Sequence, residues 1–104
     1  MMRVKEYVSQ DGRRSFNKWF QGLDQAAGFK IARAINQMEH GNFSDSRSVG
    51  EGVMERRIHS GPGYRIYYGR LERTVVLLLG GGIKRSQQAD IRRALVNWQE
   101  FRSR

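Results

Sequence analysis

The chain has 104 residues, of which 38% are hydrophobic and 11% aromatic, so it can build the core of one domain and is not disordered in composition. Nineteen Lys and Arg face ten Asp and Glu, which gives a formal net charge of +9. The absence of cysteine excludes disulfides, thiolate zinc sites and thiol nucleophiles.

The basic excess points to a polyanionic partner. Fifteen of the nineteen bases are arginine, the residue best suited to bidentate contacts with phosphate. We therefore expect nucleic acid or an acidic protein as partner, although a charge kept for solubility is the alternative. No apolar run approaches the roughly 20 residues of a membrane span, and MMRVKEYVSQDGRR lacks the apolar stretch of a signal peptide. We expect a cytoplasmic protein with no membrane partner.

The first half of the chain predicts a strand and two helices. Residues 3–9, RVKEYVS, alternate between polar and apolar and predict the strand. The first helix is capped by Ser15, and the second restarts at Asp24 and ends at Gly41. Apolar residues recur at helical spacing in both: Phe16, Trp19, Phe20 and Leu23, then Ile31, Ala34, Ile35 and Met38. Residues 41–52 are polar and predict a loop.

The second half predicts three strands and a last helix. The strands cover residues 53–60, 64–70 and 74–80, and the last of these is apolar on both sides, as in a central strand. The segment GGIKRS predicts a loop, and Ser86 caps a helix with Trp98 on its apolar face. The order β-α-α-β-β-β-α predicts one α+β domain over residues 1–104, with helices packed on a four-stranded sheet.

Strand alternation sorts the hairpin VMERRIHSGPGYRIYYGR, residues 53–70, onto two faces. The apolar set is expected to face the helices: Met54, Ile58, Tyr64, Ile66 and Tyr68. The polar set is expected to line the opposite, open face: Glu55, Arg57, His59, Arg65 and Tyr67. This arrangement requires an odd number of residues in the connecting turn.

Converging bases on that open face are the main functional signal. Glu55 cannot neutralise two arginines and a histidine, and the next loop adds Lys84 and Arg85. We therefore expect an external anion there, against the alternative of a solvated face with ion pairs. The segment LLLGGGIKRS fails the spacing of a phosphate-binding loop, and its glycines more often mark a sharp turn or a close backbone approach. Two histidines without ligand spacing predict no metal site.

The stretches ERRIHSGPGYRIYYGR and VVLLLGGGIKRSQQADIRRAL resemble the RelE/HigB-like toxins of type II toxin–antitoxin modules, closest to the addiction-module killer proteins. The element order matches over essentially the whole chain. The resemblance implies a RelE-like fold and an mRNA interferase, a ribonuclease that cuts mRNA on the ribosome and arrests growth. It also implies a cognate antitoxin encoded beside it and no cofactor.

In that family the ribose 2′-OH attacks the adjacent phosphate, which needs a base, an acid and charge stabilisation but no metal. The resemblance places the family's arginines on Arg57 and Arg65 and its basic loop residue on Lys84. His59 and Tyr67 are the candidates for base and acid, with His59 favoured because imidazole titrates near neutral pH. The predicted catalytic residues are Arg65, Arg57, His59, Lys84 and Tyr67, and the RNA-binding residues are Arg85, Arg57 and Arg65.

Two positions depart from the family pattern. Arg56 replaces a leucine on the face assigned to the core, and we expect its stem along the sheet edge with its guanidinium in water. A tyrosine that some members carry near the last helix has no counterpart, since Gln87 and Gln88 occupy that region. The same fold also serves toxins that inhibit DNA gyrase by binding, without cutting RNA, and this is the alternative function. A degenerate or phage-derived binding module is a third hypothesis.

Overall fold

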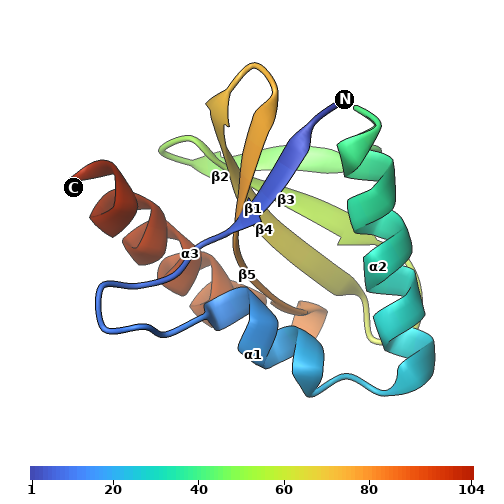
Figure 1. The fold of residues 1–104 in the computed structure, drawn as a ribbon. Helices are drawn as coiled ribbons and strands as arrows, with labels where there is room; N and C mark the ends of the chain where they lie inside the picture. The colour runs from blue at the N-terminus through green and yellow to red at the C-terminus, as the bar shows by residue number, and fades with distance from the viewer.

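The structure is a computed structural model that describes residues 1–104 as three α-helices and a five-stranded sheet (Figure 1). The strands are β1 Arg3–Glu6, β2 Ser46–Gly50, β3 Val53–Ile58, β4 Tyr64–Glu72 and β5 Val75–Ile83. The helices are α1 Ser15–Gln21, α2 Gln25–Glu39 and α3 Gln87–Arg102, with a 3-10 turn η1 Lys84–Ser86 before α3. The α+β class is confirmed, but the prediction of four strands is wrong. None of the helices has both the length and the apolarity needed to span a membrane.

The strands lie in the order β1-β5-β4-β3-β2. Only β1 and β5 run parallel, with Arg3 opposite Val75, so the first strand of the chain pairs with the last. Since β5 lies between β1 and β4, the prediction of a central strand is confirmed. The expected loop GGIKRS is instead the end of β5 followed by η1.

β2 is the strand that the sequence analysis missed. It lies within the polar segment 41–52 and pairs antiparallel with β3. The turn between them passes through Gly50, Glu51 and Gly52, all with positive φ (113°, 53° and 89°). Glycine adopts this left-handed backbone at little cost, and here two of the three residues are glycine. Because β2 pairs outside β3, β3 is an interior strand.

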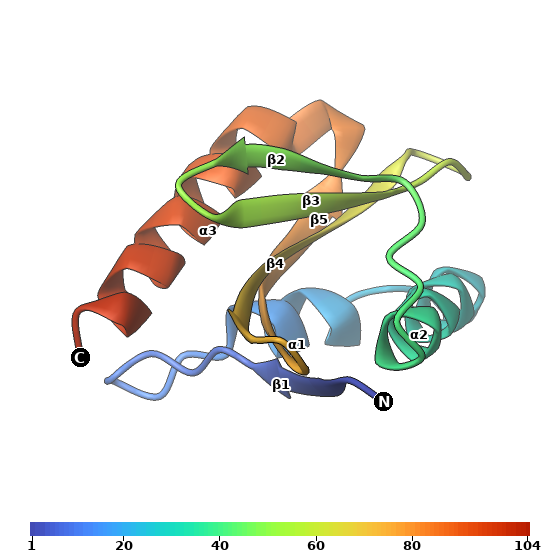
Figure 2. The same ribbon diagram turned by 90° about the horizontal axis from the view of Figure 1, so that it is seen from above.

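Helices cover both faces of the sheet (Figure 2). One core layer packs α1 and α2 against the sheet: Phe16, Ala27, Ile31, Ala34, Met38, Tyr64, Ile66, Tyr68, Val76 and Leu78. The other packs α3 against the opposite face: Tyr7, Val53, Tyr67, Leu77, Leu79, Ala94 and Trp98. The apolar hairpin residues thus face α1 and α2 as predicted, while their polar neighbours lie on the α3 side.

The two serine caps expected at helix starts do not form. Ser86 instead donates its hydroxyl hydrogen to Oδ2 of Asp90 at 2.5 Å, inside α3. The start of α1 is held by the carboxylate of Glu6, which accepts a hydrogen bond from the Asn17 backbone N–H at 2.7 Å. Both serine hydroxyls therefore bond to α3 instead, since Ser15 accepts a hydrogen bond from Nδ2 of Asn97 at 3.2 Å.

Two of the three successive glycines of β5 are required by packing. A Cβ on Gly81 would overlap the indole of Trp19, and a Cβ on Gly82 would overlap the carboxylate of Asp90. Gly80 differs, because a Cβ there would meet no heavy atom within 4 Å. The interpretation of a close backbone approach is confirmed at two positions, and the third borders an open space.

Candidate functional site

The β3–β4 hairpin brings the predicted polar residues onto one face of the sheet. Residues 59–63 form its turn, which gives the odd number that the face assignment required. Arg57 lies opposite Arg65, and Glu55 lies opposite Tyr67. Because paired residues share a face, the prediction that these four side chains lie together is confirmed.

This face is not open, so that part of the prediction is wrong. Glu55 and Tyr67 have no exposed surface, and Arg65 is 8% exposed. α3 covers the middle of the face, and its first residue, Gln87, donates a hydrogen bond from Nε2 to Oε2 of Glu55 at 2.8 Å. A helix could cover a carboxylate here because its own first turn supplies a polar partner.

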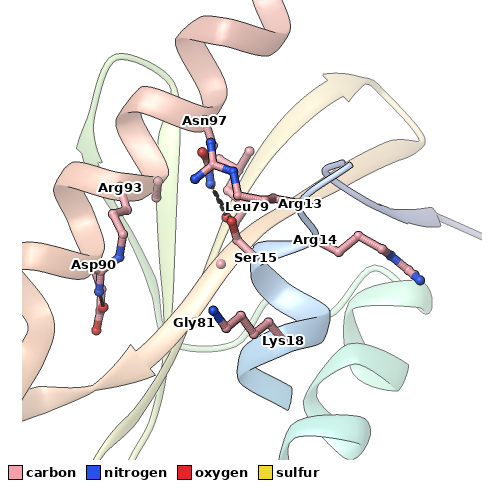
Figure 3. A pocket seen from close by; sticks show the side chains of 11 residues that line it. Arg13, Arg14, Ser15, Lys18, Leu79, Gly81, Asp90, Arg93 and Asn97 are labelled. Carbon is pink, nitrogen blue, oxygen red and sulfur yellow. Dashed lines mark hydrogen bonds and ion pairs between the residues drawn. The ribbon is translucent and has the colours of Figure 1, made fainter. Parts of the chain in front are cut away.

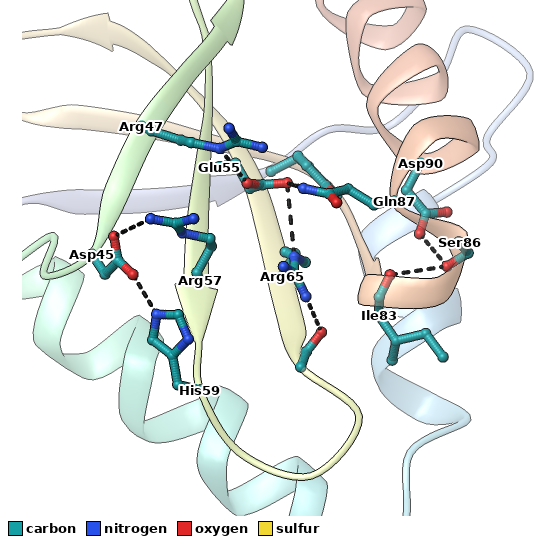
Figure 4. Close-up of polar contacts among 12 residues, drawn as sticks. Asp45, Arg47, Glu55, Arg57, His59, Arg65, Ile83, Ser86, Gln87 and Asp90 are labelled. Carbon is teal, nitrogen blue, oxygen red and sulfur yellow. Dashed lines mark hydrogen bonds and ion pairs between the residues drawn. The ribbon is translucent and has the colours of Figure 1, made fainter.

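Glu55 is the centre of a buried polar cluster (Figure 4). Besides the bond from Gln87, it accepts hydrogen bonds from Nε of Arg47 at 2.9 Å and from the hydroxyl of Tyr67 at 3.0 Å. Nε of Arg65 lies 3.9 Å from Oε2. Burial raises the pKa of Glu55, but the hydrogen bonds from Gln87, Arg47 and Tyr67 outweigh burial and leave it lowered. The protein itself therefore satisfies this carboxylate.

Tyr67 lies underneath α3 and is fully buried. Burial, together with the charge of Glu55, raises the pKa of its phenol. A phenol in this position cannot touch a bound phosphate or give up its proton near neutral pH. The predicted catalytic role of Tyr67 is therefore dropped.

Arg65 is held rigidly at the hairpin turn. Its Nη1 donates to the carbonyl of Gly63 at 2.8 Å, and its buried Nε has no hydrogen-bond partner. Lys84 lies against the same turn, since its Cβ would be 3.4 Å from a Cβ placed on Gly63. Arg85, also in η1, is exposed. Of the predicted bases, Arg65 and Lys84 are brought together, and Arg85 stays at the surface beside them.

Asp45 holds the other two predicted residues and was missed in the sequence. Nη2 of Arg57 donates to its Oδ1 at 2.9 Å, and Nε2 of His59 contacts its Oδ2. The hydrogen bond from Arg57, followed by that from His59, lowers the pKa of Asp45 to about 2. The expectation of an unneutralised cluster is thus wrong at Arg57 and His59. Asp45 could have been found only by predicting β2, whose pairing brings it beside β3.

Arg56 does not reach water as expected. It is 5% exposed, and its Nη2 donates to Oε1 of Gln37 in α2 at 2.6 Å. Its Nε and Nη1 are buried without hydrogen-bond partners, and burial lowers its pKa. The prediction placed Arg56 at a sheet edge, but β2 pairs on the outer side of β3 and removes that edge.

No three His, Cys, Asp or Glu side chains come together closely enough to hold a metal ion. The predicted site residues form two groups at the β3–β4 hairpin (Figure 4). One is the fixed guanidinium of Arg65 with Lys84 beside it, and the other is the pairing of His59 with Asp45.

No family model matches the chain. An uncharacterized protein of Haemophilus influenzae is 39% identical to it over 88 residues, which make up 84% of this chain and 89% of the Haemophilus protein. The aligned length exceeds what any one motif would give and includes most of the sheet and helices described above. The chain therefore belongs to the same family as this Haemophilus influenzae protein.

Proposed function

We propose that this protein is the toxin of a type II toxin–antitoxin module with a RelE-like fold, a ribosome-associated endoribonuclease that cuts mRNA by 2′-OH attack on the scissile phosphate. The reaction class comes from the resemblance of the hairpin and the β5–α3 segment to such toxins. The observation that carries the proposal is the guanidinium of Arg65, a permanent charge fixed in a nearly buried position beside Lys84.

Arg65 is suited to stabilising the phosphorane. Its neighbours in the strand, Tyr64 and Ile66, are buried against α2, which fixes where the guanidinium emerges. The hydrogen bond to Gly63 fixes the fork further. A cation that is already in place stabilises charge developing in the transition state without reorganising. Lys84, which is exposed, adds a second and more mobile charge.

His59 is suited to proton transfer. Its Nε2 contacts the ionised carboxylate of Asp45, which favours the tautomer with hydrogen on Nε2. In that tautomer Nδ1 carries the lone pair that can accept a proton, and 69% of the side chain is exposed, so a ribose 2′-OH can reach it. Arg57 shares the same carboxylate and is assigned to positioning Asp45 rather than to binding phosphate.

The test is primer extension on an mRNA in a purified translation system. Wild-type protein should cut mRNA on the ribosome, and Arg65→Ala should slow cleavage by ~10²–10³-fold, by analogy with the loss of one oxyanion-stabilising donor. Arg70→Ala is the matched control, because Arg70 is an exposed arginine on the same strand. Melting temperatures of both variants separate a catalytic defect from a folding defect.

One outcome would overturn the catalytic role of Arg65, and another would overturn the nuclease activity itself. If Arg65→Ala lowers the melting temperature but cuts mRNA at the wild-type rate, Arg65 only supports the fold. If wild-type protein cuts no mRNA but blocks DNA supercoiling by gyrase, the gyrase-binding alternative replaces the nuclease. Expression in cells gives a further check, since the protein alone should arrest growth and its neighbouring antitoxin should relieve the arrest.

A further inference from the structure

A cavity of about 320 Å³ lies between α1, the end of β5 and α3 (Figure 3). None of the predicted site residues lines it. Its charged lining comes from the loop before α1, from α1 and from α3: Arg13, Arg14, Lys18, Arg93 and Asp90. Four cations therefore surround this cavity with one carboxylate.

The single carboxylate of the lining, that of Asp90, already has partners within the protein. Asp90 accepts a hydrogen bond from Ser86 at 2.5 Å and is also paired with Arg93. Lys18 makes no ion pair with any carboxylate of the protein, and Figure 3 shows it extending from α1 toward α3. An anion entering the cavity would thus meet at least one cation with no competing partner.

Two other arginines of the lining, Arg13 and Arg14, form only exposed ion pairs. Arg13 pairs with Asp11 at 3.3 Å, and Arg14 pairs with Glu6 at 2.7 Å, and more than half of each arginine side chain is exposed. Exposed pairs of this kind contribute about 0–1 kcal/mol, so a stronger anion can take over their cations. The cavity can therefore offer several charges to one ligand.

The floor of the cavity is bare backbone. Gly80 lines it, and a Cβ there would meet no heavy atom within 4 Å. At Gly81 and Gly82 the side chains of Trp19 and Asp90 already occupy the space where a Cβ would lie. Asn97 of α3 also lines the cavity, and its Nδ2 donates a hydrogen bond to the carbonyl of Leu79 at 3.0 Å. A larger side chain at position 80 would not clash with its neighbours, but it would take up space in the cavity.

We propose that this cavity binds a phosphate group, supplied by the RNA backbone next to the cleaved position. A second hollow shares Lys18 and Arg93 with the cavity and extends along Ile83 to Ser86. Ser86 belongs to η1, which also contains Lys84 and Arg85. A basic groove of this kind follows the backbone of single-stranded RNA regardless of sequence. The choice of RNA rests on the proposed function, but the choice of phosphate rests on the cavity alone.

The experiment measures binding of a short single-stranded RNA with 2′-O-methyl groups, which cannot be cut by 2′-OH attack. Fluorescence anisotropy is recorded over a range of salt concentrations for wild type, Lys18→Ala, Gly80→Val and Lys5→Ala. Lys5→Ala is the matched control, because Lys5 is exposed on β1 and lines none of these hollows. Gly80→Val fills the cavity without changing the charge.

Lys18→Ala should weaken binding about 5-fold and reduce the slope of log K against log salt by about 0.7, the value for one contact with a single strand. Gly80→Val should weaken binding without this change of slope, and Lys5→Ala should do neither. Melting temperatures identify a variant that fails to fold. Lys18 is exposed on α1, so Lys18→Ala keeps the test valid even if Gly80→Val unfolds.

Wild-type binding by Lys18→Ala would overturn the RNA assignment. A titration with inorganic phosphate, followed through the backbone amide signals of Gly80 and Gly81, separates the sources. Saturable shifts that disappear in Lys18→Ala support the phosphate site, and their absence overturns it. RNA binding that depends on Lys18, in a protein that cuts no mRNA, would keep this site and reject the nuclease. If the wild-type protein cuts mRNA but Lys18→Ala binds RNA as tightly as wild type, the nuclease is kept and this phosphate site is rejected.

Discussion

Gln87, the first residue of α3, donates its side-chain amide to the buried carboxylate of Glu55 on β3 at 2.8 Å (Figure 4). This contact joins the start of the last helix to the middle of the sheet, next to Arg65. It is also one of three hydrogen bonds that keep Glu55 ionised without water. The amide of Gln87 therefore anchors the start of α3 over the candidate site, in addition to the apolar packing of Ala94 and Trp98.

Gln87→Ala should lower the free energy of unfolding by about 1–3 kcal/mol, because a buried charged acceptor loses a donor. Urea denaturation measures the loss. Gln88→Ala is the control, since Gln88 is exposed on the same turn and should change stability by less than about 0.5 kcal/mol. Equal effects of the two substitutions would show that Gln87 does not hold α3 on the sheet.

Asp45 should make the stability of the fold depend on acid pH. Its pKa is about 2 in the folded protein, against about 3.9 for an unperturbed Asp. A carboxyl whose pKa is lowered by folding stabilises the fold above its unfolded pKa, and this contribution disappears as the pH falls from about 4 to about 2. Asp45→Asn should therefore be less stable than wild type at pH 6, and the difference should shrink within that window. A difference independent of pH, measured by urea denaturation, would contradict the ion pairs of Asp45.

Arg56→Leu should leave the free energy of unfolding unchanged or raise it by about 1 kcal/mol. The arginine buries two nitrogens without partners, and removing such groups in favour of an apolar side chain of similar size is neutral or favourable. Its partner Gln37 is partly exposed and can turn to water. Arg56→Ala, which leaves a cavity instead, should be less stable than Arg56→Leu. Thermal denaturation compares the two, and equal losses would mean that the charge of Arg56 itself supports the core.

Alanine substitutions along β5 should separate the three glycines. Gly81→Ala and Gly82→Ala should each cost about 1–3 kcal/mol, because the new Cβ overlaps Trp19 or Asp90. Gly80→Ala should be close to neutral, since its Cβ enters open space. Melting temperatures of the three variants provide the measurement. A loss at Gly80 as large as at Gly81 would contradict the open floor of the cavity.

Local pattern was sufficient to predict the faces of the hairpin. Alternation placed Ile66 against the helices and Arg65 on the other side, and the parity of the turn then followed from the register. The same pattern could not reveal β2, because all of its residues except Val49 are polar or glycine, so it forms a strand only by pairing with β3. Tertiary context decided that strand, as it often does at the edge of a sheet.

The candidate site was predicted less well, because the side chains that bind the hairpin residues come from elsewhere in the chain. Asp45 reaches His59 through the pairing of β2, and Gln87 reaches Glu55 through the packing of α3. Neither contact leaves a periodic signal in the sequence. Charge alternation in the hairpin was therefore mistaken for an open face, although α3 covers Tyr67 completely.

The parallel pairing of β1 with β5 also governs the order in which the molecule can be built during synthesis. Arg3 can pair with Val75 only after Val75 has been synthesised. The nascent chain therefore carries an unpaired first strand until about three quarters of it has been made. Closing so long a loop costs entropy before the new pairing returns any free energy. Lys84 and Gln87, which complete the surroundings of Arg65, emerge later still. The candidate site is thus assembled only when translation of the chain is nearly finished, and a chain cut short before α3 would carry the arginines without the helix that fixes them.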